Sequence, residues 1–300
     1  MSLNSEIQNY NDGLLDAYSA VNTKGGTVPA NKNLDNLPTA INSVPSGGGD
    51  LVFAISKNVG GSNGISGGNQ LLKKVSSPIV VDANVTDLSN AFYGVTNLEG
   101  KITLTGGGSI TTMAGAFEVP ATMQGSLKLT EVDLSGLSFS SNGVSFADFM
   151  YKHSSVTSVK LPHNIKVLNL SNAFRSASSG YPMQITSLDL SGWDTSACSS
   201  FEYCFGMCNS LTRLDLSGWT NPNTKSTTGM FSINGNALES IIIDSSEVFN
   251  LSASNAISSS PIARGTCYVY VPDSLVSSYQ AANYWSTYAS QIKGLSELPA

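Results

Sequence analysis

The chain has 300 residues, of which 12% are charged and 41% hydrophobic, and its formal net charge is −6. This composition supplies ample apolar side chains for a core and argues against wholesale disorder. The negative charge argues against nucleic-acid binding, because neutralising phosphates needs clustered Lys and Arg. No apolar run approaches the roughly 18 residues that span a bilayer. Residues 1–12 lack the basic and apolar regions of a signal peptide, so we expect neither a membrane span nor a signal peptide in this chain.

Residues 1–50 are predicted to form a small helical head. Apolar side chains recur every three or four residues on one helix face, at Ile7, Tyr10, Leu14, Tyr18 and Val21. A second short helix is expected from Leu34 to Val44, and glycines 47–49 indicate a linker. Two small amphipathic helices need a partner surface. They could cap the first repeat, or they could form an attachment or oligomerisation head, which the glycine linker favours.

Residues 51–128 are predicted to be the irregular start of a repeat array. Leu51–Ile55 and Ile79–Val81 have the apolar composition of strands. The glycine-rich loop between them contains overlapping G-x-S-x-G matches at Gly60–Gly64 and Gly64–Gly68. That nucleophile motif needs a preceding strand, a following helix and a nearby histidine base, and this context is missing from the sequence. We therefore expect no serine hydrolase.

From residue 129 the chain repeats one strand phrase of the form apolar-x-x-apolar-x-apolar. Its five copies, at intervals of 27, 29, 26 and 27 residues, begin at Leu129, Val156, Ile185, Leu211 and Leu238. A second series keeps step with them, at Phe117, Met150, Phe174, Phe205, Phe231 and Ile257. Two interleaved series with a matched period predict a solenoid. Parallel strands would stack coil on coil, with the second and third apolar residues of each phrase facing the core.

The most regular stretch begins at Ile185 and reads ITSLDLSGWDTSACSSFEYCFGMCNSLTRLDLSGW. Its phrases LDLSGWDTS and CFGMCNSLTRLDLSGW resemble the BspA-like leucine-rich repeat of bacterial surface proteins, which is also found in phage tail and fibre proteins. The resemblance is strong over residues 185–245 and absent from the head. It implies a leucine-rich-repeat solenoid over residues 51–271, with parallel strands and short helical or irregular return segments. The asparagine of other leucine-rich repeats is replaced by Trp193 and Trp219.

Residues 272–300 are predicted to close the array with a capping helix. Asp273 is a candidate N-cap. The helix would carry Leu275, Val276, Tyr279, Tyr284, Trp285 and Tyr288. This piece resembles the terminal segment often seen after such repeats, and a cap of this kind covers the exposed core of the last coil.

Cysteines and histidines are the candidates for metal or thiol chemistry. The four cysteines are Cys198, Cys204, Cys208 and Cys267. Cys204 and Cys208 lack C-x-x-C spacing and have no histidine beside them, so we expect buried free thiols rather than a metal site or a disulfide. His153 and His163 flank one strand in polar loops and are expected on the surface. We expect no metal and no cofactor.

The outward positions of the strand phrases form the candidate binding face. They are predicted to lie side by side at Thr103, Asp133, Lys160, Asp189, Asp215 and Ile242. At a strand spacing of roughly 4.8 Å, Asp189 would repel Asp215 unless the carboxylates are solvated, hydrogen-bonded or bridged by a cation. Two interpretations stay open, a solvated acidic face and a ligand or calcium contact. The candidate ligand- or receptor-binding residues are Glu131, Asp133, Lys160, Asp189, Arg213 and Asp215.

No acid–base pair, phosphate loop or metal cluster stands out in the sequence, so we expect a recognition or structural protein and not an enzyme. The first hypothesis is a phage or prophage virion protein, such as a tail fibre or tip. It would bind a protein or glycan on a host cell surface and contact other virion proteins through residues 1–50. The alternative is a bacterial cell-surface or secreted adhesin. Both place the chain on a virion or outside cells, and a homo-oligomer stays open.

Overall fold

The computed structural model describes residues 78–96, 98–176 and 181–299, and the single positions 17, 27, 28, 30, 54, 55 and 58. The chain divides into two compact units, Met1–Phe53 and Ala54–Ala300. The predicted helical head and its linker lie almost entirely outside the described residues, and so do both G-x-S-x-G matches.

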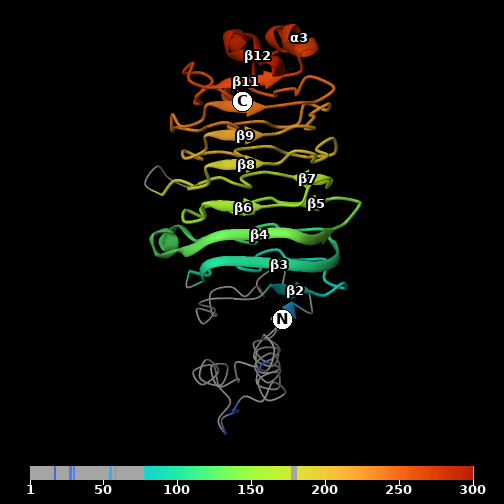
Figure 1. Cartoon of the computed structure of the whole chain (residues 1–300), viewed down its shortest axis with the longest axis vertical. Helices are drawn as coiled ribbons and strands as arrows, with labels where there is room; N and C mark the ends of the chain where they lie inside the picture. The colour runs from blue at the N-terminus through green and yellow to red at the C-terminus, as the bar shows by residue number, and fades with distance from the viewer. Residues whose placement is uncertain are drawn as a thin grey trace. The chain divides into compact units, whose positions relative to one another are not determined.

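The second unit is a parallel β-solenoid with few helices, and its strands stack one above another along the chain (Figure 1). One five-stranded sheet has the order β1-β2-β3-β4-β6, and another has the order β12-β11-β10-β9-β8. β5 and β7 pair separately, to one side of these strands in the view (Figure 1). Among the described residues, we find no helix with the length and apolar character needed to cross a membrane.

The strands of the solenoid are short except for two that run for 12 residues each. In chain order they are β1 (Ala54–Ile55), β2 (Ile79–Val81), β3 (Glu99–Ile110), β4 (Lys128–Phe139), β5 (Val144–Ser145), β6 (Ser158–Lys160), β7 (Val167–Asn169), β8 (Ser187–Asp189), β9 (Arg213–Asp215), β10 (Ser240–Ile242), β11 (Tyr268–Val271) and β12 (Ile292–Gly294). The helical segments are α3 (Val276–Ala281) and the 3-10 helices η2 (Ala121–Ser126), η3 (Ser254–Ala256), η4 (Asp273–Leu275), η5 (Ser286–Gln291) and η6 (Leu295–Glu297).

The strands alternate buried and outward side chains, as the repeated phrase predicts. In β8, Leu188 is 3% exposed whereas its neighbour Asp189 is exposed. The register sets Leu188 opposite Leu214, and Leu214 opposite Ile241, so the apolar residues form an inward column. Burial of each such side chain stabilises the fold by roughly 1.5–3 kcal/mol. The predicted solenoid is confirmed, with parallel strands stacked coil on coil.

The return segments keep the predicted period. The N–H of Phe117 donates to the carbonyl of Phe149, and the N–H of Phe174 donates to the carbonyl of Cys204 in the next coil. This ladder continues through the later coils. Every member of the predicted series is buried, namely Phe117, Met150, Phe174, Phe205, Phe231 and Ile257. The return segments therefore form the second wall of the core.

An equivalent position in six of the return turns has a left-handed backbone. Asparagine, aspartate, glycine and one tyrosine occupy it, at Asn90, Gly115, Asp148, Asn172, Tyr203 and Gly229. Short polar residues and glycine tolerate this conformation, whereas a tyrosine seldom adopts it. The ring of Tyr203 lies over Gly229, where a Cβ would be 2.2 Å from the ring, and the Arg175 guanidinium stacks 4.2 Å from the ring centroid. Gly229 is thus needed both for its φ and for the space under Tyr203.

Aromatic rings run through the core along the stacking direction. Ring centroids lie between 5.0 Å apart, for Phe92 and Phe117, and 6.1 Å apart, for Phe174 and Phe205. The complete ladder comprises Phe92, Phe117, Phe149, Phe174, Phe205 and Phe231. In one coil Phe149 supplies the ring while its neighbour, buried Met150, occupies the matching backbone position.

The C-terminal segment differs from the single capping helix that the sequence predicts. The helix α3 covers six residues, and the segment also contains β12, which pairs with β11 and extends the sheet. Asp273 caps no helix, and its carboxylate accepts a hydrogen bond from Ser296 Oγ at 2.8 Å. Only some of the side chains predicted to cover the core are buried. Tyr279 and Trp285 are fully buried, whereas Tyr284 is 39% exposed. The helix ends where Ala282 takes an extended backbone, and the chain later pairs with β11 as β12.

Candidate recognition face

The outward side chains of the strands fall into rows, but the single predicted row from Thr103 to Ile242 is divided between Lys160 and Asp189, which lie on different sheets. On the first sheet, Thr103 pairs in register with Asp133, and Asp133 pairs with Lys160. On the second sheet, Asp189 pairs with Asp215, which pairs with Ile242. The six candidate residues therefore form two groups of three. Glu131, Asp133 and Lys160 lie on β4 and β6, and Asp189, Arg213 and Asp215 lie on β8 and β9.

In the first group, both carboxylate oxygens of Asp133 have partners within the protein. Its Oδ1 accepts hydrogen bonds from the backbone N–H and the hydroxyl of Ser135, at 3.2 and 2.7 Å. Its Oδ2 lies 2.9 Å from Lys101 Nζ. Partial burial opposes ionisation, but the bonds from Ser135 and Lys101 outweigh this effect and lower the pKa of Asp133. Glu131, two residues earlier on the same strand, and Lys160, opposite Asp133 on β6, are both exposed.

In the second group, the two aspartates at the ends of β8 and β9 begin a turn. Asp215 Oδ1 accepts hydrogen bonds from Ser217 N–H at 3.0 Å and from Ser217 Oγ at 2.6 Å. Asp189 Oδ1 accepts the N–H of Ser191 at 3.0 Å. Such bonds between an aspartate and the residue two positions on are typical of Asx turns. One oxygen of each carboxylate therefore stabilises the fold, which explains the recurring D-L-S of the repeat.

Charge repulsion between Asp189 and Asp215 is offset by these surroundings. Partial burial works against ionisation of Asp189, but the hydrogen bonds from Ser191 outweigh it, helped by the electrostatic effect of His163 and Arg213. The result is a lowered pKa for Asp189, which is ionised at neutral pH. Arg213 itself is exposed and lies in register between Ser187 and Ser240.

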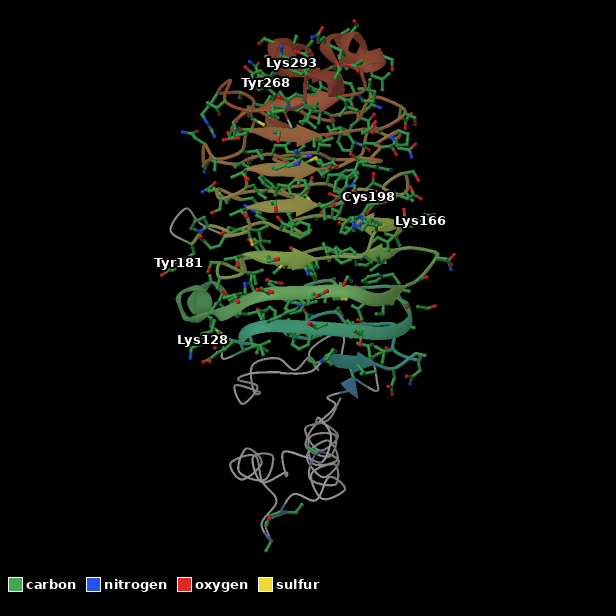
Figure 2. All side chains as sticks on the ribbon, in the orientation of Figure 1. Lys128, Lys166, Tyr181, Cys198, Tyr268 and Lys293 are labelled. Atoms are coloured by element: carbon green, nitrogen blue, oxygen red, sulfur yellow. The ribbon has the colours of Figure 1, made fainter. Side chains whose placement is uncertain are left out.

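Two tyrosines and a lysine extend these rows beyond the residues that the sequence singled out. On β11, Tyr270 lies in register with Ile242, and Tyr268 lies in register with Ser240. On β12, Lys293 lies in register with Tyr270. Tyr268 is 39% exposed, and Lys293 Nζ lies 5.9 Å from its ring centroid (Figure 2). By contrast, Ile242 and Tyr270 are buried although they point outward. The Y-V-Y-V alternation of β11 is the sequence signal for this extension of the rows.

The histidines differ in burial, and one expectation was wrong. His163 is exposed, and its Nδ1 lies 3.0 Å from the Ser191 carbonyl. His153 is 2% exposed, and its buried Nδ1 has no hydrogen-bond partner among the described residues. Burial lowers the pKa of His153 to about 4. The backbone explains the error, because His153 follows Met150 as Cys208 follows Phe205, which places both in one inward column.

The four cysteines are free and buried, as expected. Burial raises the pKa of Cys198 to about 11 and that of Cys267 to about 12, and it raises the pKa values of Cys204 and Cys208 further. Cys208 Sγ donates to the Phe174 carbonyl at 3.0 Å. Within residues 78–96, 98–176 and 181–299, no group of three or more His, Cys, Asp or Glu side chains is arranged to hold a metal ion.

Comparison with known proteins identifies one similarity. The model of a family described as "Mycoplasma protein of unknown function, DUF285" matches residues 145–240. This segment extends from β5 to the start of β10 and contains both tryptophan-ended copies of the strand phrase. Comparisons with curated proteins and with solved structures gave no match. Over about a third of its length, the chain is therefore similar to a bacterial family whose function is unknown.

Proposed function

We propose that this protein is a non-enzymatic recognition protein that presents the outward strand face of its solenoid to a protein or glycan on a cell surface. The observation that carries this proposal is the register of the strands, which holds charged and aromatic side chains in rows. Because the backbone that carries these rows is fixed before binding, no loop has to be ordered by a partner, which reduces the entropic cost of association. Charged and aromatic groups on a rigid scaffold favour selective recognition.

We also propose that the coils are BspA-like leucine-rich repeats. The family match covers the copies in which the resemblance is strongest. The tryptophans that replace the usual asparagine are buried, and each indole N–H donates to a carbonyl of the preceding coil. At this position of the repeat, a buried side-chain donor pairs with a backbone carbonyl of the neighbouring coil, and buried polar groups generally need such a partner.

The chemistry of the described side chains supports a role without catalysis. His153 is buried with a pKa of about 4, so it is a poor proton shuttle at neutral pH. The thiol pKa values are raised by burial, which disfavours the nucleophilic thiolate. The aspartates at the strand ends are occupied by turn hydrogen bonds.

We propose two biological locations for this recognition protein. The first is a phage or prophage virion, as a tail fibre or tip, with residues 1–50 attached to other virion proteins. The separate compact unit Met1–Phe53 suits such an attachment. The second is a bacterial cell-surface or secreted adhesin, which is favoured by similarity to a Mycoplasma family. Immunogold labelling of induced phage particles and of whole cells distinguishes them, because gold at tail tips supports the first and gold on the envelope supports the second.

Binding of fluorescently labelled protein to intact cells tests the recognition face. Lys160→Glu together with Arg213→Glu reverses two exposed charges on this face. Lys225→Glu is the matched control, since Lys225 is exposed in the segment between β9 and β10, away from the strands. We expect the double variant to lose roughly tenfold or more in affinity, and the control to bind like the parent chain. Equal binding by all three proteins would exclude this face.

A further inference from the structure

The main strand face of the solenoid is interrupted once, between β6 and β8. These strands carry consecutive copies of the repeated phrase, with Ser158–Lys160 in one and Ser187–Asp189 in the next. The strands β3, β4 and β6 pair in order on one side, and β8 to β12 pair in order on the other. In the part of the chain that the structure describes, no strand pairing joins β6 to β8.

Hydrogen bonds at equivalent positions show how the interruption arises. At the steps after β8, β9 and β10, the N–H that follows the strand donates to the next coil, from Leu190 to Asp215, from Leu216 to Ile242 and from Ile243 to Tyr270. Leu161 occupies the same position after β6 and has no such bond to Asp189.

A threonine ladder at the start of the strands is broken at the same step. The hydroxyl of Thr157 donates to the carbonyl of Thr130 at 3.2 Å, and that of Thr212 donates to the carbonyl of Thr186 at 3.0 Å. The backbone N–H groups of Thr157 and Thr212 make the same connections. Thr186 lies between them in the series and makes neither bond to Thr157. The two strands are therefore unpaired at both of their ends.

The opposite walls of the same step are intact. The N–H of Val167 donates to the carbonyl of Asp194 at 2.8 Å, and the N–H of Phe174 donates to that of Cys204 at 3.0 Å. The Trp193 indole also donates to the carbonyl of Pro162 at 2.9 Å. The coils thus stay connected on the turn side, and through His163 Nδ1 and the Ser191 carbonyl just past the strand ends, while the strands themselves separate.

The separation reaches the core. Val159 is the inward residue of β6, and it is partly exposed. The corresponding residues of the other coils are at most 3% exposed, namely Ile102, Val132, Leu188, Leu214, Ile241 and Val269. Water can therefore reach the strand backbone at this step, which satisfies groups that a closed sheet would pair.

We propose that the step between β6 and β8 is a flexion point, at which the strand face opens and closes while the turn side acts as the hinge. In a solenoid each coil contacts only its neighbours. The pair of neighbouring coils joined by the fewest hydrogen bonds is therefore the boundary between two segments that each unfold cooperatively. Local opening follows the segments with few buried contacts and hydrated backbone groups. The first three candidate binding residues lie on one block, and the other three lie on the other.

Amide exchange on the unmodified chain tests the flexion point. Leu161, Leu190 and Leu216 are equivalent and buried, and they differ in whether the N–H has a partner in the next coil. We expect the Leu161 and Thr186 amides to exchange on the order of a hundredfold faster than those of Leu190 and Thr212, as measured by nuclear magnetic resonance. Equal protection at the two steps would overturn the proposal.

A disulfide trap tests whether the strands approach each other. Lys160→Cys with Asp189→Cys spans the interrupted step, and Asp189→Cys with Asp215→Cys spans a paired step with matched positions. The native thiols compete little, because they are buried and their pKa values are raised. We expect the first pair to oxidise roughly tenfold or more slowly than the second and, once oxidised, to protect the Leu161 amide. Equal oxidation rates would contradict an open strand face. These measurements need no partner, so their result is independent of the proposed function.

Discussion

The indole rings of Trp193 and Trp219 stack with centroids 6.2 Å apart and planes 11° from parallel. Both rings are buried, and Trp219 Nε1 donates to the carbonyl of Leu190 at 2.9 Å. The residue that ends the repeated L-D-L-S-G-W phrase therefore links one coil to the coil before it. It fills the core and satisfies a buried carbonyl with one side chain.

Trp219→Phe should show the cost of losing the indole hydrogen bond together with part of the buried ring. Phenylalanine keeps an aromatic ring in the stack but leaves the Leu190 carbonyl without its donor, which costs about 1–3 kcal/mol in the free energy of unfolding. Urea denaturation measures the loss. Tyr268→Phe, at a 39% exposed ring, is the control and should change stability by less than about 0.5 kcal/mol. A Trp219→Phe variant as stable as this control would show that the indole hydrogen bond contributes nothing.

Leu214→Asp should unfold the central coils. Leu214 is fully buried between Leu188 and Ile241, so an unpaired carboxylate there costs more than about 4 kcal/mol. The melting temperature and amide exchange of β8 to β10 report the effect. Ser187→Asp adds the same charge at an exposed position of β8 and should leave the melting temperature nearly unchanged. An unchanged melting temperature for Leu214→Asp would contradict the inward position of this residue.

Asp215→Asn and Asp215→Ala distinguish turn formation from charge. Asparagine retains an oxygen that accepts the two hydrogen bonds from Ser217, whereas alanine loses both. We expect the alanine variant to lose about 1 kcal/mol of stability and the asparagine variant less than half of that. Equal losses of stability in urea denaturation would mean that Asp215 stabilises the fold through its charge and not through the turn hydrogen bonds.

His153 should make the fold sensitive to acid. Its pKa falls from 6.5 in the unfolded chain to about 4 in the folded one, so the unfolded state binds the proton first as pH decreases. This group has no effect above pH 6.5, and it lowers stability progressively from there to about pH 4, by about 3 kcal/mol in total. Urea denaturation at several pH values measures this slope.

The matched variant is His153→Cys, because cysteine is the residue found at the equivalent position of the same inward column, Cys208. It should flatten the slope between pH 6.5 and 4, whatever its effect on stability at neutral pH. Carboxylates with lowered pKa values, such as that of Asp189, act at lower pH, because their contribution is present above their unfolded pKa and is lost as pH falls through the folded one. A slope unchanged by His153→Cys would show that His153 is solvated in the native chain.

The repeat and the two walls of the core follow from the pattern of apolar residues in the chain. The leucines of the strand phrases and the series from Phe117 to Ile257 are buried as the period requires, because each coil must bury its apolar residues against its neighbours. The register of the outward rows follows from the same periodicity, so the six candidate residues could be named in advance. Their role in binding stays a prediction.

Features that depend on contacts between coils become visible only in the folded chain. The fold placed His153 in an inward column although polar residues surround it in the chain, and it used Asp215 to form a turn. It also shortened the capping helix to α3 and added β12, whose backbone finds partners in β11. The opening between β6 and β8 has only a faint signal in the sequence, the 29-residue interval from Val156 to Ile185. Pairing, burial and hydrogen bonding between coils are properties of the stacked fold, and a periodic pattern specifies their average but not the exceptions.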